Sequence, residues 1–275
     1  MNNLHRELAP ISSAAWKAID AEARRVLKLK LAGRKVVDFR GPLGPAAAAV
    51  STGRLEPLQG EPITHVTAAR RAALPLIELR TGFELSRTEI DAIERGAEDF
   101  DVSSLIDAAT RIAFAEDTAV FHGYAAAGIR GIADASTHPH LPIAENYQAY
   151  PHSIAEATRV LRLAGVDGPY AIALGPRCYT GLTQATGEGG YPVLNVVRKL
   201  VDGPIVWAPA IDGAVVLSTR GGDWELSVGC DLSIGYRSHS DAAVSLYFVE
   251  SMTFRVVTPE AAVALGYEKA HAKKG

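Results

Sequence analysis

The chain has 275 residues, a mass of 29.2 kDa and a formal net charge of −3, from 28 Lys and Arg against 31 Asp and Glu. This balance argues against a general nucleic-acid-binding protein, which carries a basic excess, and a charged share of 21% argues against a disordered chain. The two cysteines form no Cys-x-x-Cys pair, which excludes a disulfide scaffold and a cysteine-based zinc cluster.

The apolar share is 48%, or about 54% when Gly is counted in place of Tyr, slightly above the usual range for soluble domains. Part of the apolar surface is therefore expected to be buried against something other than this chain. The N-terminal sequence MNNLHRELAP has no apolar core, and no apolar run approaches the ~18 residues of a membrane span. We therefore expect a cytoplasmic protein with no membrane partner.

Apolar periodicity predicts the first helix over about residues 13–32. Ser12 or Ser13 can cap its start, and Gly33 ends it. A short strand over 34–39 follows. Gly and Pro residues then punctuate a segment with weak periodicity, which predicts an extended β-rich arm over about 46–80.

The clearest helix start is Ser86-Arg-Thr-Glu89, where the two polar side chains are expected to form a reciprocal capping box. Leu85 and Ile90 would be the matching hydrophobic staple. This helix is expected to end near Gly96, and a longer one is predicted over about 103–121.

The second half of the chain has a mixed α/β pattern. A proline-containing loop over 133–151 is followed by elements predicted from apolar runs and breakers: helices over 153–164 and from Pro192, and strands over 170–174, 205–208, 214–219, 224–230 and 244–257. The last strand is unusually long for a compact domain. It indicates an extended, tile-like subunit.

A search for catalytic patterns finds no Gly-x-Ser-x-Gly, His-Glu-x-x-His or Gly-Lys-Ser/Thr motif, so we expect no catalytic residues and no cofactor. Three isolated features have a functional and a simpler interpretation. The glycines at 187–190 could suggest a phosphate loop, His138 with His140 a metal site, and Cys178 a nucleophile. We favour the simpler interpretation for each. The glycines would form a surface loop, the histidines would lie in a polar loop without a metal, and Cys178 would be a small buried hydrophobic residue.

Two acidic groups also have simpler interpretations. Glu98, Asp99 and Asp101 lack a calcium-loop pattern and are expected to form a cap and a solvated turn. Glu116 and Asp117 could be a carboxylate pair on the long helix, but neighbouring helix positions are expected to face different ways.

Several short segments, in order along most of the chain, resemble the encapsulins, the bacterial nanocompartment shell proteins related to linocin-type bacteriocins. The segments are Leu8-Ala-Pro-Ile, Trp16-Lys-Ala-Ile-Asp20, Gly33-Arg-Lys-Val-Val-Asp38, Gly41-Pro-Leu-Gly44, Pro75-Leu-Ile-Glu-Leu-Arg80, Asp91-Ala-Ile-Glu-Arg-Gly96, Gly165-Val-Asp-Gly-Pro-Tyr170, Gly221-Gly-Asp223, Asp231-Leu-Ser-Ile-Gly-Tyr236 and Glu250-Ser-Met-Thr-Phe254.

The resemblance implies an α+β subunit with the tailed-phage, Hong Kong 97-like major capsid fold. Its expected parts are a peripheral domain, an axial domain and an extension loop, with a spine helix over 101–121. Carried onto this chain, they are an N-terminal helix and start of the peripheral domain at 1–45, the extension loop at 46–85, the peripheral domain with the spine helix at 86–133, the axial domain at 134–219, a return to the peripheral domain at 220–257 and a C-terminal segment and tail at 258–275.

The resemblance also implies self-assembly into an icosahedral shell around a cargo enzyme, a dye-decolourising peroxidase first or a ferritin-like iron-storage protein second. The cargo's C-terminal targeting peptide would dock on Leu31, Arg34, Val37, Asp38, Asp231, Leu232, Ile234 and Tyr236. These residues could instead simply pack the helix onto the sheet. Solutes would pass a five-fold pore loop formed by Thr186, Gly187, Glu188, Gly189 and Gly190.

From the charge balance and the motif search, we expect no nucleic-acid partner and no metal. Two alternatives remain at this point, a major capsid protein that still serves a phage and a protease or bacteriocin. The basic tail after Leu265 is longer than the family core needs and is expected to be a disordered extension.

Overall fold

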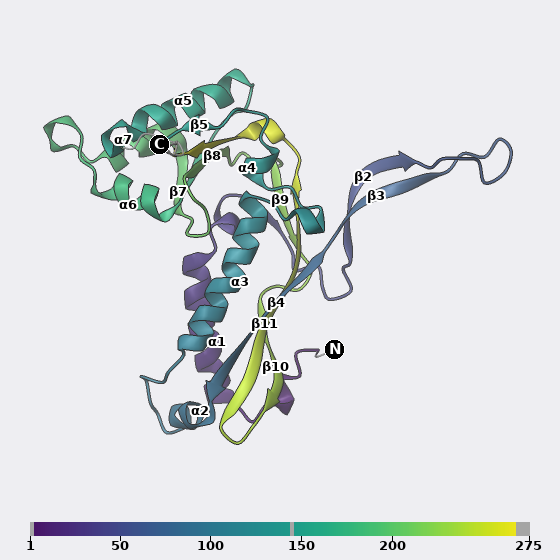
Figure 1. Ribbon diagram of the computed structural model, residues 1–275, viewed down its shortest axis with the longest axis vertical. Coiled ribbons are helices and arrows are strands. Elements are labelled where there is room, and N and C mark those ends of the chain that lie inside the picture. The colour runs from purple at the N-terminus through teal and green to yellow at the C-terminus, as the bar shows by residue number, and fades with distance from the viewer. Residues whose placement is uncertain (1–2, 144–145, 268–275) are drawn as a thin grey trace, which may run out of the picture.

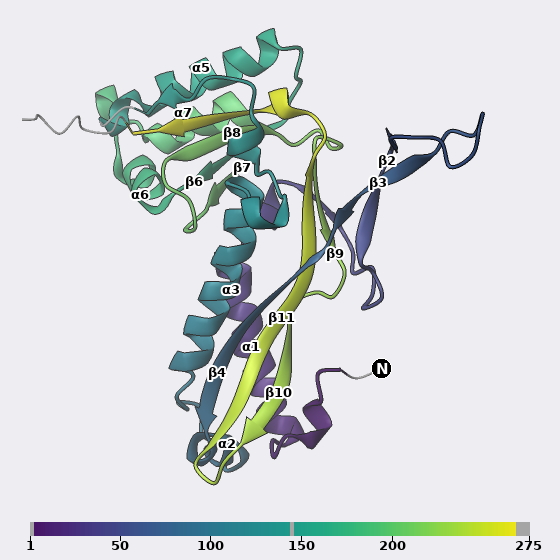
Figure 2. The same ribbon diagram turned by 45° about the vertical axis from the view of Figure 1, so that its right-hand side comes forward.

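A computed structural model describes residues 3–143 and 146–267. The molecule is elongated, and a long helix and a long strand of one of its sheets run along it (Figures 1 and 2). The helices are α1 Ser13–Lys30, α2 Arg87–Glu94, α3 Ser103–Phe121, α4 Ile132–Ala135, α5 Tyr150–Leu163, α6 Pro176–Gln184 and α7 Val193–Val201. The strands are β1 Asp38–Arg40, β2 Ala49–Pro57, β3 Ala69–Pro75, β4 Ile77–Ser86, β5 Leu141–Pro142, β6 Tyr170–Leu174, β7 Asp202–Trp207, β8 Ala214–Ser218, β9 Trp224–Val228, β10 Ser233–His239, β11 Ala243–Val256 and β12 Ala262–Gly266.

The long strand β11 organises the first sheet. Its first half lies between β10 and β4, both antiparallel to it, and its second half pairs with β9, which in turn pairs with β1. The chain then passes directly from β11 to β12 in the other sheet. The predicted long strand is confirmed, and its length follows from pairing with different strands along its two halves.

Three helices cover this sheet and form one apolar core with it. In α1, Ile19, Ala23 and Val26 recur at helical spacing and are buried, and Ser12 accepts a hydrogen bond from the Ala15 N–H at 3.1 Å. The core also includes the first half of α3, Ile90 of α2 and apolar side chains of β4, β10 and β11. The predicted helix over about 103–121 is confirmed by α3.

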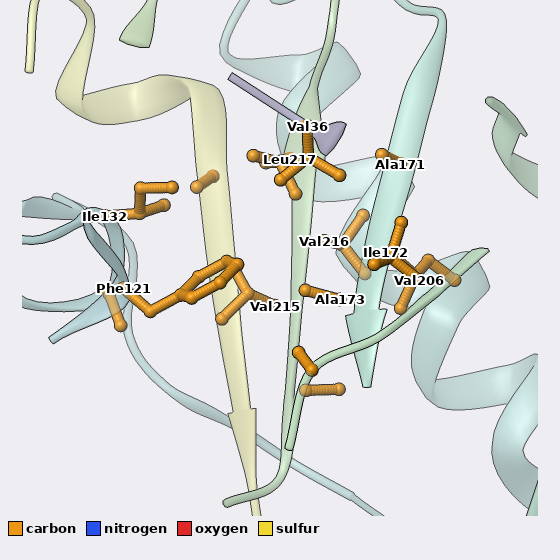
Figure 3. Packing of buried hydrophobic residues seen from close by; sticks show 14 of the residues in the cluster. Val36, Phe121, Ile132, Ala171, Ile172, Ala173, Val206, Val215, Val216 and Leu217 are labelled. Carbon is orange, nitrogen blue, oxygen red and sulfur yellow. The ribbon is translucent and has the colours of Figure 1, made fainter. Parts of the chain in front are cut away.

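The second sheet has the strand order β5-β12-β8-β6-β7, with α5, α6 and α7 beside it (Figure 1). All five residues of β6, Tyr170–Leu174, are buried, as the uninterrupted apolar run predicts. Figure 3 shows side chains of β6, β7 and β8, including Ile172, Val206 and Val215, packed together with Phe121 at the end of α3. The spine of the molecule, α3, therefore contributes to both cores.

The predicted β-rich arm is a two-stranded hairpin of β2 and β3 that projects from the body (Figures 1 and 2). Its apolar side chains Leu55, Leu58 and Ile63 are more than half exposed. The body of the subunit thus leaves apolar surface uncovered, as the composition suggested. β4, which the predicted extension loop included, lies in the first sheet beside β11.

Two local predictions were wrong. The predicted strand over 34–39 begins as a 3-10 turn at Gly33–Lys35, and only Asp38–Arg40 is extended. Ser86 makes no side-chain cap, because it is still the last paired residue of β4, opposite Ala243. The Glu89 carboxylate instead accepts the Asp101 N–H at 2.9 Å and ties the loop after α2 to that helix.

Several elements were not predicted. These are α6, β10 and β12, together with the short α4 and β5 within the predicted loop over 133–151. None of the described helices is long and apolar enough to cross a membrane. The expectation about the tail concerns mostly residues 268–275, which lie outside the described residues.

Candidate functional site

The residues predicted to dock a peptide come from two segments, one after α1 and one leading into β10. The structure joins these segments through Arg34, whose Nη1 donates to Asp231 Oδ1 at 2.8 Å. Leu31 and Ile234 are buried in the core of the first sheet, and Leu232 and Tyr236 pack against the same core while remaining partly exposed. Six of the eight predicted residues therefore belong to one region.

Val37 and Asp38 lie apart from that region. Val37 packs against the core of the second sheet, and Asp38 accepts the Gly222 N–H at 2.6 Å. Asp38 forms no hydrogen bond or ion pair with Arg34. Arg34 and Asp38 therefore contact different parts of the chain.

Arg34 is the centre of a cluster of charged side chains between α3, β11 and the segment before β10. Its guanidinium forms a forked contact with Glu116, with Nε at 2.9 Å from Oε1 and Nη2 at 2.6 Å from Oε2, and Nη2 lies 2.5 Å from Glu250 Oε1. Glu116 and Glu250 are fully buried, whereas the Asp231 side chain is 45% exposed. The cluster thus has a dry side and a side open to solvent.

Burial shifts the proton equilibria in this cluster. Burial alone lowers the pKa of Arg34, but the hydrogen bond and charge of Glu116 raise it more, so the guanidinium stays charged. Burial raises the pKa of Glu250 well above its ordinary value, and the neighbouring charge of Glu116 raises it further. Its Oε2 has no hydrogen-bond partner among the described residues. We therefore assign the proton of this cluster to Glu250.

The next residue on α3 grips the same turn from another side. Asp117 accepts the N–H groups of Ala32 and Gly33, each at 2.8 Å. Burial raises its pKa to about 7, although these two backbone hydrogen bonds act in the opposite direction. A Cβ at Gly33 would lie 3.1 Å from Asp117 Oδ1, so the close approach favours glycine. Glu116 and Asp117 thus both hold the turn after α1, but they contact different groups of it, the Arg34 side chain and the backbone of Ala32 and Gly33.

The sequence contained a signal for Glu116 and Glu250 that the search for catalytic motifs did not use. Glu116 follows the buried stripe of an apolar helix, and Glu250 stands in phase with Leu246, Phe248 and Met252 on β11. A charged residue in such a position requires a buried partner of opposite charge. The sequence alone did not indicate that Arg34 is the shared partner.

The N-terminal segment covers part of the same region. The Tyr236 N–H donates to the Leu4 carbonyl at 2.8 Å, and Arg6 forms an ion pair with Asp20 at 2.9 Å while stacking over Trp16. The chain therefore already places a segment of its own, a turn followed by the 3-10 helix Arg6–Leu8, against β10 and beside α1.

The predicted pore residues form the loop between α6 and α7. Thr186 bridges to Pro192, and the Gly187 N–H donates to the Tyr191 carbonyl at 2.8 Å, which closes the loop at its base. Gly189 and Gly190 have φ values of 72° and 75°, which favour glycine. Figure 1 shows this loop projecting beyond the helices of the second sheet.

The isolated features from the sequence have structural partners. The Cys178 thiol is buried 3.1 Å from the Tyr267 hydroxyl, and burial raises its pKa, which disfavours a nucleophilic thiolate. His138 Nε2 lies 2.9 Å from the Glu260 carbonyl. Within residues 3–143 and 146–267, no group of three or more His, Cys, Asp or Glu side chains could hold a metal ion.

Solved structures share this fold. A virus-like particle from Pyrococcus furiosus aligns with a TM-score of 0.66 and 14% identity, covering 90% of this chain and 98% of that one. A structure from Gordonia phage Cozz aligns with a TM-score of 0.54 and 16% identity, covering 87% of each chain. The fold is thus that of the Hong Kong 97-like capsid proteins, as predicted.

Sequence comparison defines the family. Residues 1–253 match the family model described as "Encapsulating protein for peroxidase". The type 1 encapsulin shell protein of Rhodospirillum rubrum is 53% identical, covering 96% of each chain, and that of Mycobacterium tuberculosis is 50% identical, covering 97% of this chain and all of the relative. The chain belongs to the encapsulin family of shell proteins, which form capsid-like particles and are not enzymes.

Proposed function

We propose that the shell built from this chain encloses a cargo enzyme in the cytoplasm. The first candidate for the cargo is a dye-decolourising peroxidase, and the second is a ferritin-like iron-storage protein. The observation that carries the cargo class is the description of the matching family as an encapsulating protein for peroxidase. A peroxidase cargo would link the compartment to oxidative stress, and a ferritin-like cargo would link it to iron storage.

The cargo's C-terminal targeting peptide would dock beside α1 and β10. Leu232 and Tyr236 are partly exposed above a continuous apolar core, and the half-exposed Asp231 carboxylate lies next to them. These groups offer apolar contacts and one hydrogen-bond acceptor to an extended peptide. Leu31, Arg34 and Ile234 are largely buried and would shape the docking surface rather than contact the peptide broadly. Val37 and Asp38 would lie at its margin.

The docking proposal is tested with Leu232→Ala together with Tyr236→Ala, in cells that co-express a dye-decolourising peroxidase carrying a targeting peptide. We expect intact shells that contain at least about tenfold less peroxidase, because truncation removes the apolar contacts of the peptide. Leu163→Ala, which truncates a 73% exposed side chain on α5, is the matched control and should load normally. Normal loading in the double variant would refute the docking surface.

Small molecules would enter through pores lined by residues 186–190. The exposed Gly189 and Gly190 and the closed base of the loop support this role, because glycines permit close approach of symmetry-related loops. Deleting Thr186–Gly190 should change the rate at which a small dye reaches an enclosed peroxidase. An unchanged rate, with shells still intact, would exclude this loop as the main entrance.

A further inference from the structure

An arginine-lined groove lies where the arm joins the body. It has a volume of about 380 Å³ and is lined by Thr52, Arg54, Leu74, Gly128, Arg130, Phe254, Arg255, Val256, Val257 and Pro259. Arg54 comes from β2, Arg130 from the turn after α3 and Arg255 from the end of β11. Three separate parts of the chain thus each contribute an arginine to the lining of one groove.

The groove has little compensating negative charge. Arg54 and Arg130 are exposed and form no ion pair with any residue that the structure describes. Arg255 Nη2 lies 3.4 Å from Glu225 Oε2, and its buried Nε has no hydrogen-bond acceptor among the same residues. Glu225 and the exposed Glu260 are the nearby carboxylates along the chain. The exposed guanidinium groups of Arg54 and Arg130, which no carboxylate of the described residues neutralises, favour an anionic partner from outside the subunit.

A backbone irregularity sets the position of Arg54. The pairing of β2 with β3 shifts register between Ser51 and Leu55, and Gly53 between them has a φ of 73°. Such a bulge redirects the following side chain and twists the strand. Arg54 therefore belongs to a shaped surface and not to a regular strand face.

The complementary charge lies at another end of the same molecule. Residues 84–107, which we call the acidic tip, contain eight Asp or Glu and two Arg, a net charge of −6. Glu94, Glu98 and Asp99 are exposed and have no partner among the described residues. The loop that carries the last two is held in shape by the Glu89–Asp101 hydrogen bond and by Asp101 Oδ1, which accepts the Ser103 N–H.

Figures 1 and 2 both show α2 at the far end of the molecule from α5–α7, with the arm projecting well away from it. The tip and the groove of one chain thus lie apart, and they can meet only between copies. We propose that the acidic tip of one subunit docks into the arginine groove of a neighbouring subunit in the shell. This head-to-tail contact uses different surfaces on the two partners, as closed rings of identical subunits require.

Charge reversal tests this contact, and it does not depend on the cargo. The groove variant is Arg54→Glu with Arg130→Glu, and the tip variant is Glu98→Arg with Asp99→Arg. Each alone places like charges opposite each other, so we expect the subunit concentration for half-maximal assembly to rise at least about tenfold. The four-site variant, which restores opposite charges with exchanged sign, should assemble within about threefold of the original protein.

Light scattering and electron microscopy measure assembly, and circular dichroism checks that the subunits remain folded. Arg24→Glu with Lys28→Glu makes the same charge change on exposed positions of α1 and should assemble normally. High salt should weaken assembly of the original protein and strengthen that of the two-site variants. Normal assembly of both two-site variants would overturn the proposal, as would a four-site variant no better than either. Normal shells that lose only cargo would assign the groove to cargo and also overturn it.

Discussion

The two ends of α3 pack into apolar cores, whereas the middle of α3 carries two buried acidic side chains. Leu105 and Ile112 pack into the core of the first sheet, and Val120 and Phe121 pack into that of the second. Between them, Glu116 and Asp117 are fully buried and hold Arg34 and the turn after α1. Apolar packing tolerates small adjustments, but a buried charge requires one specific partner in one position. The charged middle of α3 therefore fixes the position of the turn after α1 against α3, and the apolar ends of α3 supply stability.

The strongest way to break this arrangement is to remove the shared cation. Arg34→Ala leaves the Glu116 carboxylate buried without a partner, which we expect to lower the free energy of unfolding by about 3–5 kcal/mol. Guanidinium unfolding of purified shells, followed by circular dichroism, measures the change. The same result explains why Arg34→Ala is a poor test of peptide docking, since loss of loading would follow from loss of folding.

A compensated variant separates charge from packing. Arg34→Met together with Glu116→Gln and Glu250→Gln removes the buried charges as a group, so it should recover most of the stability lost in Arg34→Ala. A triple variant as unstable as Arg34→Ala would mean that the hydrogen-bond geometry, and not the unpaired charge, dominates the loss.

Apolar packing in the second sheet gives the next largest effect. Leu174 on β6 is fully buried, so Leu174→Ala should destabilise the subunit by about 3 kcal/mol through lost contacts and a residual cavity. Leu174→Met, which nearly conserves volume, should cost less than about 1.5 kcal/mol. Unlike the Arg34 variant, neither should change the pH dependence of stability, and the same unfolding assay at several pH values checks both points.

Asp117 gives a smaller effect that depends on pH. Its pKa is raised to about 7 from an ordinary value of 3.8, so the folded state binds this proton more tightly than the unfolded state. Its contribution to stability is thus complete below about pH 4, falls as the pH rises towards 7 and is constant above that. Asp117→Asn should flatten this part of the stability profile. An unchanged profile would show that folding does not raise the pKa of Asp117.

Local patterns in the sequence were sufficient for elements whose apolar residues repeat regularly. Ser13–Lys30, Ser103–Phe121 and Tyr170–Leu174 follow from periodicity and breakers alone. The segment after α1 was misassigned because Asp117, more than eighty positions away, holds Ala32 and Gly33 in a turn. β10 was missed because its end, Arg237–His239, is polar and gives no clear alternation of apolar residues. Its pairing with β11, which the sequence does not reveal, makes this segment a strand.

The family resemblance predicted the fold, but it could not assign individual side chains to peptide docking or to packing. The residues that surround Arg34 in the sequence are compatible with either role. Its role in the charged cluster depends on Glu116 and Glu250, which lie 82 and 216 positions away. Long-range partners of this kind leave only an indirect sign in one sequence, a carboxylate in phase with apolar neighbours.

The smallest expected effect tests where the proton in the cluster lies. If Glu250 is the protonated carboxyl, an amide resembles it in size and hydrogen-bonding groups, so Glu250→Gln should change the unfolding free energy at neutral pH by less than about 1 kcal/mol. Glu116→Gln is the matched control on the other side of Arg34, and it removes the carboxylate that holds the guanidinium by two contacts. Its cost should be clearly larger, since a charge-assisted fork is lost and Arg34 keeps its charge. Equal costs for the two variants would contradict the assignment of the proton to Glu250.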